Sequence, residues 1–300
     1  MIPYGRGEWY DAGMTEQQAQ SAIPGGGTIN AIVVAPPRTD NGVLTLALAL
    51  PKRIELERAA GRFVLARCGA QSELERLQQW SIYLRRPLFL AAARPQPDSA
   101  GEHATWQVCA PPRRQDDPGY RWLAQRAAGE TLNLTGPYGN GFVLLPPVRR
   151  LLLLAEPARL PLLTPLIDEI LDRGGQVSLL LVEEQAGLAD FTALAAALPF
   201  NVELHPLAAT DWNQGLVSSL RWADQLCAAL GADRLPPLAE AIRQARLRLE
   251  SGFAFALADA DFACGYGSCL ACAVPLANGS LTRACIHGPV FDLLELAGKG

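Results

Sequence analysis

Apolar and polar residues alternate in short segments over the first half of the chain. Turn-forming residues separate the segments, for example Pro36-Pro37 and Asp40-Asn41-Gly42. Several short strands at this spacing are typical of an antiparallel barrel or sandwich. The predicted strands are residues 28–35, 43–50, 62–68, 87–93, 104–110 and 129–135. The pattern therefore predicts a small antiparallel β-barrel that ends near Pro146-Pro147.

The pattern changes at residue 150. Residues 150–155 and 177–182 are continuous aliphatic runs, which is typical of strands buried on both faces. Apolar residues at helical spacing lie between them, over 162–173. The alternation continues with a short helix over 190–198, a strand over 202–206, and two further segments over 221–230 and 237–249. Alternating strands and helices predict a parallel, doubly wound α/β domain.

The last part of the chain differs from both the predicted barrel and the predicted α/β domain. Residues 253–257 lead into a cysteine-rich loop, and a hairpin is expected over 273–275 and 280–283, with Asn278-Gly279 as its turn. The first 27 residues, which close with three glycines, read as a flexible extension. The predicted division of the chain is thus 1–27 extension, 28–148 β-barrel, 149–252 α/β domain and 253–300 cysteine-rich segment.

Four cysteines carry the clearest chemical signal in the sequence. They are separated by four, two and twelve residues: Cys264, Cys269, Cys272 and Cys285. C-x4-C-x2-C followed by a distant cysteine is the spacing of plant-type [2Fe–2S] ligation. Gly265 and Gly267 permit the sharp bend that such a loop needs, because glycine reaches positive φ without a Cβ clash.

Other uses of the cysteines stay open. A structural zinc site also takes four cysteines, but usually as two C-x2-C pairs, and only one such pair exists here. Free thiols or disulfides are the remaining alternative. Of the other cysteines, Cys68, Cys109 and Cys227 stand in apolar segments and are expected to be buried structural residues.

Composition narrows the class of protein. The chain has 300 residues, 49% of them hydrophobic, which supports two or three domains with substantial cores. The net charge of −4 gives no sign of a nucleic-acid-binding face. The first residues lack the pattern of a signal peptide, and the longest aliphatic run, 151–155, is far too short to cross a membrane. The expectation is a soluble, cytoplasmic protein.

A barrel, an α/β domain and a C-terminal cysteine segment in this order resemble a known family. That family is the electron-transfer subunit of class B dihydroorotate dehydrogenase, in the ferredoxin-reductase superfamily. The resemblance covers about residues 28–295. It is carried by ACGYGSCLACAVP and RACIHGPVFD near the C-terminus, GPYGNGF at 136–142, AAGRFVLARC at 59–68 and RRPLF at 85–89.

The resemblance implies a role in an electron relay of pyrimidine biosynthesis. In the family, NADH reduces FAD, a [2Fe–2S] cluster passes the electrons on, and the FMN of a catalytic partner subunit exchanges them with dihydroorotate and orotate. The chain would then be an electron-transfer subunit of a hetero-oligomer rather than a stand-alone enzyme. The barrel would be of the FAD-binding type and the α/β domain of the NAD-binding type.

Several nucleotide-contacting positions depart from the family. Phe89 replaces a flavin-contacting serine, residues 109–121 lack a Gly-x-Gly-Thr turn, and residues 155–161 lack glycine. Arg86 and Pro87 are the candidate FAD contacts that remain. These departures leave FAD binding open and argue against NAD binding.

Two alternative functions follow from these departures. One is a non-catalytic scaffold whose FAD and NAD sites are lost and whose cluster is structural or a one-electron element. The other is a zinc-stabilised interaction protein.

Three single residues are expected to have structural rather than functional roles. Phe89 should fill the core, Glu156 should be a solvent-exposed loop carboxylate, and His287 should be an ordinary surface histidine.

Overall fold

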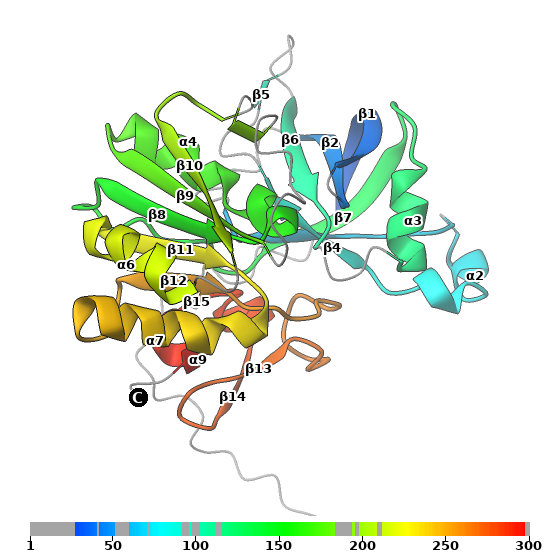
Figure 1. Ribbon diagram of the computed structural model, residues 1–300. Helices are drawn as coiled ribbons and strands as arrows, with labels where there is room; N and C mark the ends of the chain where they lie inside the picture. Colours follow the sequence, from blue (N-terminus) through cyan, green and yellow to red (C-terminus); the bar gives the residue numbers. More distant parts are fainter. Residues whose placement is uncertain are drawn as a thin grey trace, which may run out of the picture.

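The computed structural model of the chain is shown in Figure 1. It describes residues 28–40, 42–51, 60–70, 72–91, 96–97, 103–111, 116–183, 194–195, 198–208 and 212–297. The predicted extension over 1–27 and most of the predicted helix over 190–198 lie outside these residues. Among the described residues, no helix is long and apolar enough to cross a membrane.

The first domain is a closed antiparallel barrel of six strands. Strands follow one another in the order β2-β1-β7-β3-β4-β6, and pairing of β2 with β6 closes the barrel. The strands are β1 (Ile29–Asp40), β2 (Val43–Pro51), β3 (Phe63–Ala66), β4 (Arg86–Leu90), β6 (His103–Cys109) and β7 (Thr131–Tyr138), with the short β5 (Gln96–Pro97) beside β6. The predicted barrel is therefore confirmed, and its strands lie within a few residues of the predicted ones.

Short helices connect the barrel strands. The segment between β3 and β4 holds α2 (Glu73–Arg76) and the 3₁₀ turn η1 (Trp80–Ile82), and α3 (Pro118–Ala124) precedes β7. Helix α3 begins where Asp117 caps it and Pro118 takes the first position, which suits proline because no N–H is required there.

The second domain is a six-stranded sheet in the order β10-β9-β8-β11-β12-β15. Its strands are β8 (Arg150–Ala155), β9 (Gln176–Glu183), β10 (Val202–Ala208), β11 (Gln225–Ala229), β12 (Ala254–Leu257) and β15 (Val290–Asp292). All neighbours are parallel except β12 and β15. The helices are α4 (Thr164–Asp172), α6 (Trp212–Trp222) and α7 (Leu235–Arg246), with the 3₁₀ turns η3 (Pro157–Leu162) and η5 (Ala232–Arg234).

The predicted helix over 162–173 is shorter than expected. The chain first forms η3, and α4 begins only at Thr164. Pro157 and Pro161 lie in η3, where they supply no N–H groups to a regular helix.

Strand β8 is buried on both faces, as its unbroken aliphatic run predicts. Leu151 and Leu153 belong to the core that also contains α4 and barrel residues. Leu152 and Leu154 belong to the core under α6 and α7. One apolar core therefore continues from the barrel into the sheet and joins the two domains.

The cysteine-rich segment leaves the sheet and returns to it. Strands β12 and β15 pair antiparallel, with Leu257 opposite Val290, and the four cysteines lie between them in the chain. The segment holds the hairpin β13 (Ala273–Pro275) and β14 (Leu281–Arg283), then α8 (Ala284–His287), and α9 (Leu293–Ala297) follows β15. The predicted hairpin is confirmed, whereas the return strand β15 has no counterpart in the sequence prediction.

Candidate iron–sulfur centre and nucleotide positions

The cysteine loop takes the sharp bends that its glycines allow. Gly265 has φ +81° and Gly267 has φ +77°, both in the region that favours glycine. Leu270 also has a positive φ, 57°, which is uncommon for a branched residue. Three departures from regular backbone within six residues thus wrap the chain around the positions of Cys264, Cys269 and Cys272.

The four cysteines form two neighbouring pairs. Cys272 and Cys285 are buried, and the backbone N–H of Cys285 donates to the Cys272 Sγ at 3.4 Å. The backbone N–H of Ala284 donates to the Cys272 carbonyl at 2.9 Å, which holds the start of α8 against the loop. Cys264 is half-buried and Cys269 is exposed, and the Cys269 side chain helps to lower the pKa of the Cys264 thiol.

Cys264 and Cys285 differ in electrostatic environment. Burial opposes ionisation of Cys264, but N–H groups of Cys269, Tyr266 and Ser268 stabilise its thiolate and lower the pKa to about 6. Burial, together with the nearby Cys272, raises the pKa of Cys285 to about 12. A metal centre that binds all four residues as thiolates must therefore displace protons, including the proton of Cys285.

This donor set fits a two-iron cluster. Four thiols are the usual ligands of a [2Fe–2S] centre, and two thiolates bind each iron. Among the described residues, no three cysteine, histidine or carboxylate side chains are placed around a single metal ion. Two adjacent cysteine pairs are the arrangement that a binuclear cluster requires.

The barrel exit supports the return segment after Cys285. Asn140 donates through its backbone N–H to the Gly288 carbonyl and through Nδ2 to the His287 carbonyl at 3.3 Å. A Cβ added to Gly139 would lie 2.5 Å from the Pro289 ring. The turn over 136–142 therefore holds the end of the cysteine segment by close backbone approach.

Aromatic side chains fill the space between the barrel and the cysteine loop. The ring of Phe262, two residues before Cys264, lies 4.3 Å from the Phe63 ring and 5.9 Å from the Phe89 ring, centroid to centroid. Phe63 and Phe89 lie 5.5 Å apart, and all three rings are buried. The expectation that Phe89 fills the core is confirmed. The contact between Phe63 and Phe262 was not predicted, because nothing in the local pattern indicates that these distant segments meet.

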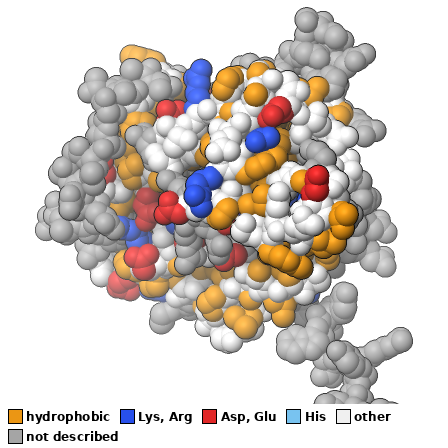
Figure 2. Space-filling model, turned by 90° about the vertical axis from the view of Figure 1, so that its right-hand side faces the viewer, with side chains coloured by type: hydrophobic (Ala, Val, Ile, Leu, Met, Phe, Trp, Pro, Cys, Tyr) orange, Lys and Arg blue, Asp and Glu red, His pale blue; other side chains and the backbone are white. Residues whose placement is uncertain are grey.

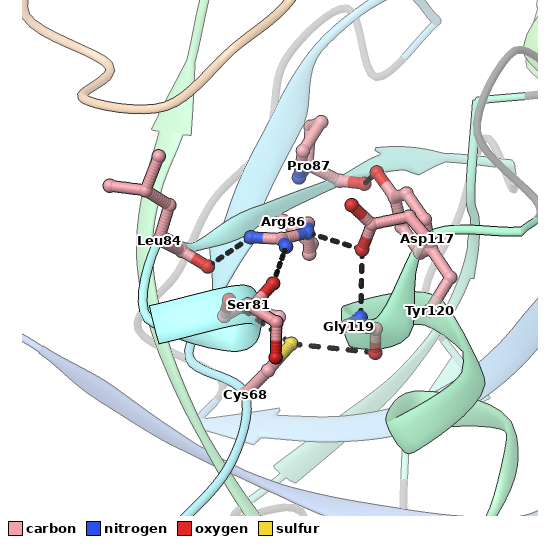
Figure 3. Close-up of polar contacts among 9 residues, drawn as sticks. Cys68, Ser81, Leu84, Arg86, Pro87, Asp117, Gly119 and Tyr120 are labelled. Atoms are coloured by element: carbon pink, nitrogen blue, oxygen red, sulfur yellow. Dashed lines mark hydrogen bonds and ion pairs between the residues drawn. The ribbon is translucent and has the colours of Figure 1, made fainter. Parts of the chain in front are cut away.

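Arg86, the candidate FAD contact, is held by the chain itself (Figure 3). Its Nε donates to Asp117 Oδ1 at 2.6 Å, and its two terminal nitrogens donate to the carbonyls of Leu84 and Ser81. The same Asp117 oxygen accepts the backbone N–H of Gly119 at 2.7 Å. A carboxylate thus lies between a guanidinium and the start of α3, where an anionic phosphate would otherwise be favoured.

Pro87, the second candidate FAD contact, follows Arg86 in β4 and has a structural role. Its carbonyl accepts a hydrogen bond from the Tyr120 hydroxyl at 3.0 Å, which joins β4 to α3. Phe89 thus lies in the aromatic core, Arg86 pairs with Asp117, and their role as FAD contacts stays a prediction.

Glu156 corrects one expectation from the sequence. It was expected to be a solvent-exposed loop carboxylate, which is wrong, because only 24% of its side chain is exposed and both carboxylate oxygens accept hydrogen bonds or ion pairs. Its partners are Arg159, Arg234 and the backbone N–H of Gly231. The arginine three residues after Glu156 is the one signal in the sequence that could have indicated this pairing.

The remaining cysteines and His287 behave as expected. Cys68, Cys109 and Cys227 are buried, and burial raises the pKa of each thiol, to about 12 for Cys68 and Cys109. His287 is exposed.

On the barrel side of the molecule, acidic and basic side chains are interspersed among apolar ones (Figure 2).

Comparisons with known proteins agree with this architecture. Residues 259–297 match the family model for the iron–sulfur cluster binding domain of dihydroorotate dehydrogenase B. The chain is 30% identical over 268 residues to the dihydroorotate dehydrogenase B (NAD(+)) electron transfer subunits of Bacillus caldolyticus and Geobacillus kaustophilus (strain HTA426). Each of these matches covers 84% of this chain and 92% of the relative.

A solved structure shares the fold at lower sequence identity. It is an NADH-dependent reduced ferredoxin-NADP oxidoreductase, described in connection with flavin-based electron bifurcation. It is 18% identical, has a TM-score of 0.61, and the match covers 89% of each chain. A type IV self-sufficient cytochrome P450 monooxygenase matches with a TM-score of 0.53 and 17% identity, over 86% of this chain and 39% of that one.

The barrel, the α/β sheet and the cysteine segment define an iron–sulfur protein with ferredoxin-reductase-like architecture. The 30% sequence identity and the coverage of both chains also show to which family the chain belongs. The chain belongs to the family of dihydroorotate dehydrogenase B electron transfer subunits.

Proposed function

We propose that the chain is the electron-transfer subunit of a dihydroorotate dehydrogenase-type complex in pyrimidine biosynthesis. Cys264, Cys269, Cys272 and Cys285 hold a [2Fe–2S] cluster, and a catalytic subunit binds the chain as its partner. The two adjacent cysteine pairs, inside the segment that matches the family's cluster-binding domain, are the observation that carries this proposal. The complex works in the cytoplasm, where reducing conditions keep the four thiols available.

The cluster supplies one-electron chemistry, and the residues around it control access. Cys272 and Cys285 lie in the core and keep one side of the site away from water. Cys269 is exposed, so a partner's redox group can approach the other side. Tyr266 and Leu270, which are 68% and 61% exposed, stand on the same loop and give a partner apolar surface to contact.

A second candidate function is a partner subunit that holds a cluster but no flavin. The pairing of Arg86 with Asp117 and the burial of Phe89 favour it. Flavin content separates the two candidates, because FAD released from the denatured protein at near one per chain would contradict the flavin-free form.

Metal analysis and spectroscopy of anaerobically prepared protein test the proposed function. We expect about two irons per chain, red-brown absorbance, and a one-electron paramagnetic signal after reduction by dithionite. With the catalytic subunit bound, dihydroorotate should reduce the cluster. Zinc in place of iron, or a colourless protein after reconstitution with iron and sulfide, would contradict the proposal.

A further inference from the structure

The six-stranded sheet has one topological switch point, between β8 and β11. From β8 the chain moves outward through β9 to β10, and it then crosses back to β11 on the other side of β8. In open α/β sheets, ligands bind outside the carboxyl ends of the strands at such a point. A dinucleotide places its pyrophosphate there, against a glycine-rich turn and the N–H groups that begin a helix.

Here the switch point is occupied by a side chain of the protein. Glu156 directly follows β8, and Gly231 lies two residues after β11. Glu156 Oε1 accepts the backbone N–H of Gly231 at 3.1 Å and pairs with Arg234 Nε at 3.0 Å. Glu156 Oε2 accepts from Arg159 Nε at 2.7 Å. Both oxygens of the carboxylate therefore have donors of the kind that would bind a phosphate.

Arg159 extends this network to a third strand end. It is 8% exposed, and its Nη2 pairs at 3.1 Å with Asp259 Oδ2, two residues after β12. Within this set, two carboxylates balance two guanidinium groups. The positive charge that would attract a pyrophosphate is thus already neutralised by Glu156 and Asp259.

The backbone at the switch point also differs from a phosphate-binding turn. After Glu156 the chain forms η3, with Pro157 at its first position, and proline has no N–H to donate. A Cβ added to Gly231 would lie 3.4 Å from Glu156 Oε1, so the carboxylate already packs against this backbone.

We propose that Glu156 closes the dinucleotide position of this chain from within, so that its cluster exchanges electrons with a one-electron carrier and not with a nicotinamide. This inference rests on the proposed function for the cluster. The carrier is an oxidised iron–sulfur protein or a flavin that accepts one electron at a time. In each transfer one electron leaves the cluster that dihydroorotate has reduced and enters the oxidised carrier. No hydride is moved, and any proton that the reduced carrier takes up comes from solvent. Two such transfers match one two-electron reaction at the catalytic partner.

The first test uses the full chain with its cluster loaded, under anaerobic conditions. Dithionite should bleach the cluster absorbance, whereas NADH should not, and equilibrium dialysis should give a Kd for NADH weaker than about 1 mM. Bleaching by NADH, or a Kd well below that value, would overturn the inference. Iron content and the dithionite signal report on the proposed function separately.

The second test asks whether Glu156 itself closes the dinucleotide position. Inorganic pyrophosphate is the probe, and Glu156→Ala should bind it at least about tenfold more tightly than the unaltered chain, a change of about 1.4 kcal/mol. Glu240→Ala is the matched control, because it removes an exposed carboxylate paired with Arg243 outside the switch point. If Glu156→Ala does not fold, Glu156→Gln removes the charge and keeps the shape. Equal pyrophosphate affinity in the Glu156 and Glu240 variants would overturn the assignment.

Discussion

The ring of Tyr138, at the end of barrel strand β7, lies against Gly265 in the cysteine loop. A Cβ at residue 265 would come within 2.7 Å of the ring atoms. Tyr138 is itself in contact with Phe63, with ring centroids 5.9 Å apart. The barrel thus forms one wall of the cluster site, and the loop takes its course only because residue 265 has no side chain.

Gly265→Ala should therefore reduce cluster occupancy. The positive φ of residue 265 costs a non-glycine residue roughly 1–2 kcal/mol, and the clash with Tyr138 adds to this. Gly279→Ala is the matched control, because Gly279 has φ +83° but no atom within 4 Å of an added Cβ. Iron content and urea unfolding measure the effect. Equal losses in both variants would mean that backbone strain alone is responsible and that the contact with Tyr138 has no role.

Cys269→Ser should abolish the cluster without disturbing the core. Cys269 is exposed, so its replacement removes a ligand and little packing. Iron content and visible absorbance should fall, and the segment around residues 264–285 should lose protection from proteolysis, since metal binding and local folding are coupled. Cys227→Ser, in the buried strand β11, is the control and should retain iron. A Cys269→Ser protein with full iron content would show that the ligand assignment is wrong.

Phe262→Ala should destabilise the protein by about 3–5 kcal/mol, the usual range for removing a buried aromatic ring. Phe262 is 5% exposed and contacts the Phe63 and Phe89 rings. Phe200→Ala serves as the control, because that ring is fully exposed. Denaturant unfolding measures both variants. Similar unfolding midpoints would contradict the view that Phe262 joins the cysteine loop to the barrel core.

Asp224→Asn should destabilise the protein in a pH-dependent way. The side chain of Arg150 donates to Asp224 and, with the backbone N–H groups of Arg149 and Arg150, lowers the pKa of the carboxyl. A carboxyl whose pKa is lowered by folding stabilises the protein above its unfolded pKa of about 4, and this contribution disappears as the pH falls through the folded value.

At neutral pH the Asp224→Asn variant should lose about 1 kcal/mol of unfolding free energy, a small value because solvent screens the pair with Arg150. The difference from the unaltered chain should shrink towards zero as the pH falls below about 4. Urea unfolding at several pH values measures it, and Glu240→Gln is the control on an exposed helix face. A difference that stays constant with pH would show that the charge of Asp224 is not responsible.

Local patterns were sufficient to predict most of the fold. The unbroken aliphatic run of β8 indicated a strand buried on both faces, and Leu151 and Leu152 indeed belong to the two different cores. The glycines at 265 and 267 indicated a bent loop because positive φ is a local property of the backbone. Strand β15 was missed because it has only three residues and owes its existence to pairing with β12.

The site was harder to predict where partners are distant in sequence. Glu156 meets Gly231 and Arg234 only because β8 and β11 are neighbours in the sheet, some 75 residues apart in the chain. In the sequence Arg86 looks like a phosphate contact, but in the folded chain it pairs with Asp117. The four cysteines could be predicted because their spacing is itself the signal. Their division into a buried and a more exposed pair depends on packing, which a spacing cannot give.

The pairing of Leu257 with Val290 fixes both ends of the cluster segment at one edge of the sheet. The chain leaves the sheet at one residue and re-enters it at the position directly opposite. Between these two points, Phe262 and Cys285 belong to the apolar core that also contains barrel residues. The cluster loop is therefore anchored by both domains at once, and a change in either domain can alter the position of its ligands.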